Sequence, residues 1–486
     1  MLMQVRRLHP VALLYFWYQS FKSGLLYLFI LFAFNFSDKL DGYFGGAVSI
    51  ILLLTVVGGV LKYLRYTYEL TPQEIILNSG IIFQKHLYIS YAKIQTLQTR
   101  QWFYLRPFGL LSLQIETSSQ SEDAPEAILP VVSRKVVAQI QAKRDALQEK
   151  EQQTETFFKS NSLAEKVPER SEPSYQIKGR DLNLYALTSL GFFPLVLGFL
   201  AIYNRLSNAI PQKYLDSTME TLAHESGLTL SLLAIVIVLL ALGSSYLLVL
   251  NRYFGFEVHQ EKEQLVTTKG LLQQNVVTAR PEKIQAVVIS QSFLRQALKL
   301  ATVQLVLASQ AASDEQDEDL VLLPVLSQGQ ALKKASRFVK WLPQKTPDLQ
   351  MVGHIGRWRL LRNMLLPTVL LVVSVGVFFR PYGWLATILL PFALWIGHYA
   401  GANSGLAVTN SDILLAQSGH LLTRKMYLIP HNKIQALSMK QTVWMKKAGL
   451  SHLEIILRSG NSQHEEEVRY LPQEQVEKIY QWYRQK

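Results

Sequence analysis

The sequence predicts a mixed membrane protein in which six transmembrane α-helices, arranged in three pairs, alternate with three copies of one small β-rich domain. Two observations lead to this fold class. Long uncharged runs alternate with stretches of ordinary charge, and charged residues make up only 17% of the 486 residues, below the roughly 25% of soluble domains. The tripeptide Lys-Ile-Gln also recurs within segments that share their spacing. A chain of this length is expected to fold as several units.

The expected spans follow from the uncharged runs, because a helix needs about 20 apolar residues to cross a bilayer. Lys22 separates the first span from the apolar, aromatic stretch 11–21. We expect that stretch to be a helix that lies at the membrane interface or enters it at an angle, with Lys22 reaching the headgroups; whether it is interfacial or part of the first span stays open. The three pairs of spans are 23–37 and 43–61, 184–203 and 228–250, and 363–379 and 382–400.

Lys and Arg gather beside one set of span ends, and this predicts the orientation. The loop between the third and fourth spans carries acidic as well as basic residues. Because Lys and Arg are enriched on the cytoplasmic side, we expect both termini and all three β-rich copies in the cytoplasm. The net charge of +13 then indicates a membrane surface rather than nucleic acid. The residues that carry the bias are Arg6, Arg7, Lys62, Arg65, Lys178, Arg180, Arg252, Arg357, Arg359 and Arg362.

Lys-Ile-Gln marks the three copies of the repeat. Around it, apolar and polar residues alternate with a period near two, which is typical of strands. On this alternation we expect the Ile to face inward and the Lys and Gln outward, at the entry to a strand rather than in a ligand site. The motif residues are Lys93, Gln95, Lys283, Gln285, Lys433 and Gln435.

The spacing around the motif makes a chance match untenable. Gly80 and Gly270 precede their lysines by the same distance, and a glycine at a hairpin turn would suit that position. The residue sixteen places after each lysine is Gly109, Lys299 or Gly449. Each copy then reaches Leu-Pro, after which the period becomes helical. We therefore expect each copy to form a small curved sheet closed by a C-terminal helix.

These patterns divide the chain into seven segments. The spans and the repeat copies alternate, and one polar linker interrupts them. The expected domains are 1–66 (interfacial segment and first helix pair), 67–150 (first β domain), 151–180 (linker), 181–251 (second pair), 252–343 (second β domain), 344–400 (third pair) and 401–486 (third β domain).

The helix pair, Lys-Ile-Gln, the segment Leu-Arg-Pro-Phe-Gly-Leu or Lys-Lys-Ala-Gly-Leu and the closing Leu-Pro together resemble bacterial membrane proteins with pleckstrin-homology-like (PH-like) domains, of the YdbS/YdbT type. The opening Arg7-Leu8-His9-Pro10 is similar to the start of the three-domain members. The resemblance covers nearly the whole chain. It implies PH-like barrels on membrane helices of the bacterial plasma membrane, a smaller one-domain sibling as partner, and a role in envelope defence, including tolerance of antimicrobial peptides.

The sequence lacks the common motifs of enzyme active sites. Cysteine is absent, which excludes disulfides, thiolate nucleophiles and cysteine-based metal sites. His-Glu-x-x-His, a phosphate-binding glycine loop and Gly-x-Ser-x-Gly are also absent. We expect no enzymatic activity, cofactor or metal. A transporter or channel formed by the helix pairs is the alternative, although the clear spans lack the ionisable residues that usually mark such a path.

The segment after Lys-Ile-Gln carries the candidate binding surface. Aromatic rings beside Arg and Lys suit a headgroup interface, where rings sit among the glycerol groups and cations meet phosphate. The same rings could instead pack each domain onto its own helix pair. Lys299 replaces the glycine of the other copies, so we expect segment 293–300 to be less turn-like and a shared ligand role to be weakest there. The candidate residues are Arg100, Trp102, Arg106, Arg295, Lys299, Trp444, Lys446 and Lys447.

The sequence thus predicts a non-enzymatic plasma-membrane scaffold. Its three cytoplasmic PH-like domains would bind protein partners, chiefly the smaller sibling, and anionic lipid. No nucleic-acid partner is expected.

Overall fold

The computed structural model describes residues 5–35, 44–117, 127–157, 173–189, 227–261, 264–308, 319–345, 347–379, 382–409, 412–459 and 462–485. The chain divides into two compact units. Unit 1 is Met1–Ser171 with Gln273–Arg280 and Ser309–Ala311, and unit 2 is Glu172–Leu272, Pro281–Ala308 and Ala312–Lys486.

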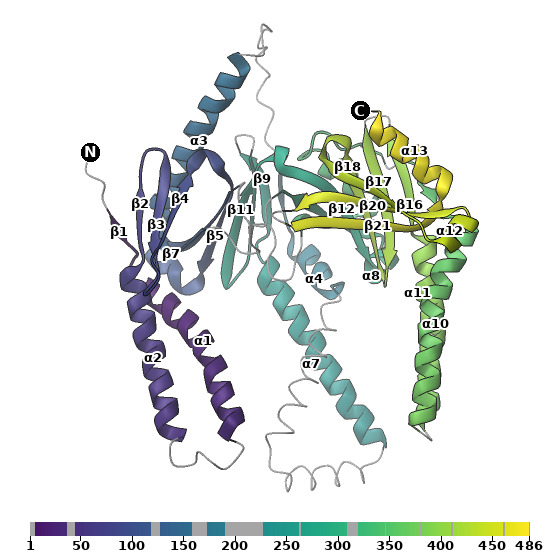
Figure 1. Cartoon of the computed structure of the whole chain (residues 1–486), viewed down its shortest axis with the longest axis horizontal. Coiled ribbons are helices and arrows are strands. Elements are labelled where there is room, and N and C mark those ends of the chain that lie inside the picture. Colours follow the sequence, from purple (N-terminus) through teal and green to yellow (C-terminus); the bar gives the residue numbers. More distant parts are fainter. Residues whose placement is uncertain are drawn as a thin grey trace. The chain divides into compact units, whose positions relative to one another are not determined.

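Two long helices, α1 (Ala12–Asn35) and α2 (Phe44–Arg65), lie side by side in unit 1 (Figure 1). They approach closely because Gly59 has no side chain: a Cβ there would lie 2.4 Å from Cδ1 of Trp17. The Trp17 indole also donates a hydrogen bond to the carbonyl of Val56 at 3.2 Å. Small residues at such contacts are typical of helix pairs in membranes.

Helix α1 joins the stretch that we expect at the interface to the first expected span. It is continuous from Ala12 through Lys22. Stretch 11–21 is therefore joined to the first expected span in one helix, and the exposed Lys22 side chain does not interrupt it.

Unit 1 contains two antiparallel sheets, with strand orders β1-β2-β3-β4 and β7-β6-β5-β11. Strand β11 belongs by sequence to the second repeat but pairs with β5 of the first. Alternate residues of β3, Ile75 and Leu77, are buried in the core, as the period of two predicts. The strands are β1 (Arg6–Arg7), β2 (Thr67–Leu70), β3 (Glu74–Ser79), β4 (Lys85–Ser90), β5 (Ile94–Trp102), β6 (Leu110–Thr117), β7 (Ala127–Ser133) and β11 (Gln273–Ala279).

Three further helical elements belong to the described part of unit 1. Helix α3 (Arg134–Phe157) follows β7 directly and packs on β6 and β7, where Ile140 is fully buried. The 3-10 helices η1 (Tyr91–Lys93) and η2 (Phe103–Phe108) precede and follow β5.

Unit 2 begins with the helices and first strands of the second repeat. Helix α4 (Gly179–Leu187) packs on the long helix α7 (Gly227–Tyr253). The strands β8 (Ser174–Gln176), β9 (Glu257–Glu261) and β10 (Gln264–Lys269) pair as an antiparallel sheet in that spatial order.

A seven-stranded antiparallel sheet follows in unit 2, in the order β14-β13-β12-β18-β17-β16-β15. Its first three strands belong to the second repeat and its last four to the third. The strands are β12 (Ile284–Ser292), β13 (Leu300–Leu307), β14 (Leu320–Ser327), β15 (Gln350–Met351), β16 (Gly405–Thr409), β17 (Ile413–His420) and β18 (Thr423–Pro430).

The third repeat closes with a three-stranded sheet of β19 (Ile434–Lys440), β20 (Leu450–Ser459) and β21 (Ser462–Pro472). The helix α13 (Gln473–Arg484) packs on all three strands through Val476 and Ile479. The remaining elements of unit 2 are η3 (Pro281–Lys283), α8 (Phe293–Ala297), α9 (Gln328–Ala335), α10 (His354–Phe378), η5 (Tyr382–Ile388), α11 (Leu389–Ala402), η6 (His431–Lys433) and α12 (Val443–Lys447).

Three helices within the described residues are long and apolar enough to cross a membrane: Gly45–Arg65, His354–Phe378 and Gly383–Ala402. They overlap the second, fifth and sixth expected spans. A shorter apolar helix, Val238–Tyr253, overlaps the fourth. Most of the third expected span, 184–203, lies outside the described residues.

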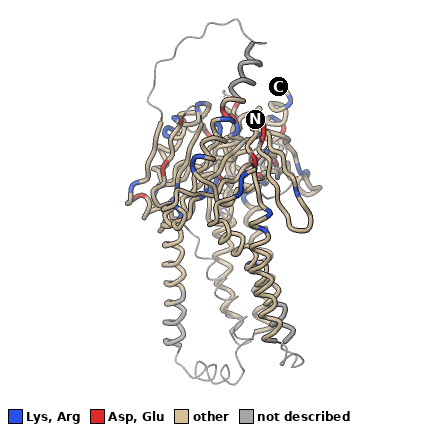
Figure 2. Tube along the Cα trace, turned by 90° about the vertical axis from the view of Figure 1, so that its left-hand side faces the viewer, with Lys and Arg blue, Asp and Glu red and all other residues tan. Residues whose placement is uncertain are grey.

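Charge separates the two ends of the long helices. Charged residues lie on the sheets and toward the helix ends that adjoin them, whereas the opposite helix ends carry none among the described residues (Figure 2). Lys62 and Arg65 occupy the last turn of α2 and Arg252 the last turn of α7, while Arg357 lies in the first turn of α10.

Candidate membrane-facing and partner-binding surface

Each Lys-Ile-Gln motif has the same local structure. A 3-10 turn ends at the lysine, and the isoleucine begins the next strand, where Ile94, Ile284 and Ile434 are at most 8% exposed. The strand register shifts directly after each isoleucine. The glutamine is therefore the extra residue of a β-bulge, a device that bends a strand.

The motif side chains differ in their surroundings. Lys93 and Gln435 are exposed, whereas Gln285 is buried, and the side chain of Gln95 lies outside the described part of the chain. Lys433 donates from Nζ to the carbonyl of Glu282 at 2.7 Å, beside Lys283 in the turn of the preceding repeat. The shared feature of the motif is thus the backbone of the strand entry.

A further shared residue, a glutamine eight places after each lysine, was missed in the sequence patterns. Gln101 donates to the carbonyl of Leu110 at 2.8 Å, and Gln441 donates to that of Leu450 at 2.8 Å. In the middle repeat, Gln291 donates to Leu300 at 2.7 Å. The bond ties the end of one strand to the start of the next across the short helix between them. Its signal was the recurrence of Gln at one offset in all three copies.

The short helix between those strands is η2, α8 or α12, and each ends at a residue with left-handed backbone. Gly109 and Gly449 have φ of 62° and 63°, and Lys299 has φ of 53°. The carbonyl of Lys299 accepts from the amide of Gln328 at 2.9 Å, as that of Gly449 does from Gln473. The expectation that segment 293–300 is less turn-like is therefore wrong: the same turn forms, with a non-glycine residue in it.

Exposed rings occur together with exposed cations at two of the three short helices, η2 and α12, whereas α8 combines the exposed ring of Phe293 with a buried arginine. Trp102 is 41% exposed at the start of η2, and Trp444 is 72% exposed on α12. Arg106 on η2 is exposed, as are Lys446 and Lys447 on α12. Arg100, on β5 just before η2, is partly exposed, and Lys299 after α8 is exposed. The Lys447 ammonium lies 5.7 Å from the Trp444 ring centre.

The third short helix, α8, departs from this pattern at Arg295, which is buried rather than part of an exposed surface. Its guanidinium lies 4.4 Å from the Tyr185 ring centre and donates to the hydroxyls of Thr188 and Ser189 at 3.1 Å. It also donates to Thr302 at 2.7 Å. Arg295 therefore fixes α8 and β13 to the end of α4 instead of meeting a headgroup.

In unit 2, the short helices α8 and α12 each contact a long apolar helix. Phe293 of α8 packs edge-on against Trp395 of α11, with ring centres 5.1 Å apart. Met445 of α12 lies in one cluster with Tyr470 and Leu360 of α10, and the Tyr470 hydroxyl accepts from Asn363 at 2.5 Å. Both short helices thus lie at the sheet-proximal ends of helices that are long enough to cross a membrane.

A second set of exposed apolar residues, also missed in the sequence, lies at the hairpin tips after Gly80 and Gly270. Ile82 and Phe83 are 85% and 88% exposed. In the second repeat, the tip residues Leu271 and Leu272 are exposed and their amides donate to Asn251 in the last turns of α7. The tip is therefore held at the end of that helix. The missed signal was a pair of large apolar residues directly after the hairpin glycine.

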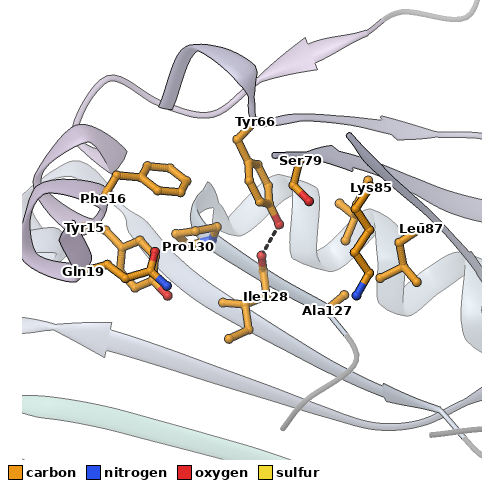
Figure 3. Close-up of a pocket in the computed structure, with 11 residues that line it drawn as sticks. Tyr15, Phe16, Gln19, Tyr66, Ser79, Lys85, Leu87, Ala127, Ile128 and Pro130 are labelled. Carbon is orange, nitrogen blue, oxygen red and sulfur yellow. Dashed lines mark hydrogen bonds between the residues drawn. The ribbon is translucent and has the colours of Figure 1, made fainter. Parts of the chain in front are cut away.

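Unit 1 contains a cavity of about 190 Å³ between the start of α1, the ends of β3 and β4, and β7 (Figure 3). Phe16 and Leu87 supply apolar walls, while Ser79 and Lys85 supply polar groups. The Tyr66 hydroxyl donates to the carbonyl of Ile128 at 2.5 Å, and burial raises the pKa of this phenol, so it stays neutral. The cavity is smaller than the roughly 300–1,000 Å³ of drug-sized sites.

Within the described residues, no group of three or more His, Asp or Glu side chains is placed to hold a metal ion. The candidate surface consists of exposed rings, exposed cations and a small cavity.

The comparison with known proteins agrees with the repeat. The profile of the bacterial PH domain family matches three times, at residues 25–148, 212–342 and 364–486. The chain is also 25% identical, over 99% of its length and 99% of the relative's, to the UPF0699 transmembrane protein YdbT of Bacillus subtilis (strain 168). The resemblance inferred from the sequence is confirmed: the chain belongs to the bacterial PH domain family, of which it carries three copies.

Proposed function

We propose that this chain is a non-enzymatic scaffold of the bacterial plasma membrane, crossing it six times with both termini and the three PH-like domains in the cytoplasm. The observation that carries the proposal is the placement of α8, α12 and the hairpin tip after Gly270 at the ends of apolar helices. The basic residues at those same ends support the orientation, because Lys and Arg favour the cytoplasmic side.

Lipid contact accounts for the exposed rings. Trp102 and Trp444 would be costly on a water-facing surface, but tryptophan is favoured at the headgroup level of a bilayer. The neighbouring cations Arg106, Lys446 and Lys447 would each contribute about 1 kcal/mol near an anionic membrane surface. The cavity in unit 1 offers a more selective lipid contact, since Lys85 and Ser79 provide a cation and a donor beside an apolar wall.

The protein partner we assign is a smaller membrane protein with a single PH-like domain, bound through the same exposed rings and cations. Large aromatic residues and arginine dominate the binding energy of protein interfaces, and Trp102, Arg106 and Trp444 are of these types. Envelope defence against antimicrobial peptides is the role we propose for the assembly. Loss of the chain should then raise the sensitivity of the cell to such peptides.

The test is a pull-down from native membranes in mild detergent, with mass spectrometry that retains proteins and lipids. We expect a small PH-like membrane protein in fixed ratio. The combined change Trp102→Ala, Arg106→Ala, Trp444→Ala and Lys446→Ala should remove it while the purified chain still unfolds cooperatively. A matched control replaces another exposed cation and ring, Lys478→Ala with Tyr480→Ala on α13, and should retain the partner. If the chain is recovered without a partner, and neither the fourfold variant nor the control variant changes what is recovered, the scaffold proposal is rejected.

The contacts within helix pairs favour the scaffold over a transport path. Gly397 of α11 lies against the backbone of α10, where a Cβ would approach Cα of Leu361 to 2.6 Å. Gly59 of α2 packs equally closely on Trp17 of α1. At these two points the paired helices are in direct contact.

A further inference from the structure

Strand pairing joins consecutive repeats in this chain, and it does so twice with the same register. Strand β5 of the first repeat pairs with β11 of the second, with Thr99 opposite Val276. Strand β12 of the second repeat pairs with β18 of the third, with Ile289 opposite Met426. In both junctions the residue six places after one Lys-Ile-Gln lysine lies opposite the residue seven places before the next. The junction is therefore a repeated structural unit.

The junction in unit 2 is well packed. Ala286 and Val288 on β12 are fully buried and lie in one cluster with Tyr427 on β18 and the core of the third repeat. Arg424 on β18 donates to the Gln291 side chain on β12. Burying such a face contributes about 25 cal/mol per Å² of apolar surface, in addition to the ladder of backbone hydrogen bonds.

Among the described residues, the two ends of this series remain unpaired. Strand β19 is the edge of the last sheet and β4 the edge of the first. Ala436 on β19 is exposed, although its counterpart Ala286 is fully buried in the junction. Met439 on β19 is 40% exposed and Tyr88 on β4 is 60% exposed. In the internal junctions, β5 and β12 pair with β11 and β18. By position in the repeat, β19 corresponds to β5 and β12, and β4 corresponds to β11 and β18, so the two free edges are complementary.

We propose that β19 of one copy of the chain pairs with β4 of a second copy in the register of the internal junctions. Met439 would lie opposite His86, and Ser438 opposite Leu87. A head-to-tail contact of this kind closes into a ring if the rotation allows it and otherwise extends as a filament. The residues changed in the pull-down (Trp102, Arg106, Trp444 and Lys446) lie on neither β19 nor β4, so either result can fail without the other, although Lys85 and Leu87 of β4 also line the cavity.

The charged residues at the proposed contact are compatible with pairing between β19 of one copy and β4 of a second copy. The register places Lys85 opposite Lys440, and like charges opposite each other are unfavourable by themselves. The Lys440 ammonium, however, lies 2.5 Å from Glu454 and is influenced further by Glu465 and Glu467, which together raise its pKa. Lys440 is thus paired with a carboxylate of the neighbouring strand β20, which offsets its repulsion of Lys85 on the approaching β4 strand.

Disulfide trapping can test this register, because the chain contains no cysteine and only the introduced cysteines can form a disulfide between chains. Residues directly opposite in antiparallel strands have Cα atoms about 4.5–5.5 Å apart, within the range of about 4.4–6.8 Å that a disulfide requires. Two differently tagged full-length chains, Met439→Cys and His86→Cys, are co-expressed in membranes and oxidised. We expect a covalent dimer that carries both tags, at several-fold higher yield than with the mismatched pair Met439→Cys and Tyr88→Cys.

An internal control uses the junction that the structure already shows. Ser290→Cys with Lys425→Cys in one chain should form an intramolecular disulfide, because these residues lie opposite each other in β12 and β18. The proposal is overturned if this control forms while the Met439–His86 dimer does not. Equal yields from the matched and mismatched pairs would also overturn it, since they would indicate random collision. Native mass spectrometry of the uncrosslinked chain should show more than one copy per complex; a single copy bound to another PH-like protein would assign β19 to that protein.

Discussion

At the scale of the residue, Lys299 adopts the same left-handed backbone conformation as the glycines at its position in the other two repeats. Its φ of 53° matches the glycines at the same place in the other repeats. Left-handed backbone costs a non-glycine residue roughly 1–2 kcal/mol. Space is not the difficulty, because no atom lies within 4 Å of a Cβ built on Gly109 or Gly449.

We therefore expect Lys299→Gly to stabilise the second repeat by about 0.5–1 kcal/mol, the relief of backbone strain less the entropic cost of a glycine. Gly449→Ala should destabilise the third repeat by a similar amount. Thermal unfolding midpoints in one detergent would measure both changes. Lys299→Ala is the control for the lost charge, and it should leave the midpoint unchanged; a rise equal to that of Lys299→Gly would show that the lysine side chain, not its backbone, is unfavourable.

At the scale of the element, strand β21 contains two adjacent carboxylates, Glu466 and Glu467, whose pKa values are shifted in opposite directions. Burial raises the pKa of Glu466 above its ordinary value of 4.5, although the Ser418 hydroxyl donates to it at 2.5 Å. Glu467 also loses water, but Arg469 and His452 each donate to it at 2.7 Å and together lower its pKa. Neighbouring positions of a strand face opposite sides of the sheet, which separates the two environments.

The two shifts predict opposite pH dependence. The folded state holds the Glu466 proton more tightly than the unfolded state, so the stability it contributes is present below pH 4.5 and is lost as pH rises through the raised pKa. Glu466→Gln should therefore raise the unfolding midpoint at pH 7 and change it little at pH 4. Glu467 contributes above pH 4.5 and loses its contribution as pH falls through the lowered pKa, so Glu467→Gln should lower the midpoint at pH 7. Parallel responses of the two variants across this range would contradict the assignment.

The sequence predicted the elements better than their partners. The recurrence of Lys-Ile-Gln and Leu-Pro at fixed offsets located the three domains, because strand alternation and turn residues are local signals. The pairing of β5 with β11, and of β12 with β18, had no such signal, since it joins strands far apart in the chain. Arg295 was placed on the surface for the same reason: its burial depends on Tyr185 and Thr188, more than a hundred residues away.

At the scale of the whole molecule, the repeat couples each domain to a helix pair as well as to the next domain. In unit 2, α8, α12 and the hairpin tip after Gly270 lie beside the ends of apolar helices. The three domains can lie on one side of the membrane only if every pair of spans returns the chain to that side. Three pairs satisfy this requirement, whereas loss of one span would place the following domain on the opposite side. The number of spans and the side of each domain are therefore a single claim.

Cysteine labelling tests that claim on the full-length chain, which has no cysteine of its own. We expect a membrane-impermeant maleimide to label Ser217→Cys, between the third and fourth expected spans, in intact cells. Ser313→Cys, in the second PH-like domain, and Lys478→Cys, in the third, should react only after permeabilisation, because Lys- and Arg-rich ends hold these domains in the cytoplasm. Labelling of Ser313→Cys in intact cells, with Lys478→Cys protected, would mean that an odd number of spans separates the two domains, and the paired arrangement would then have to be abandoned.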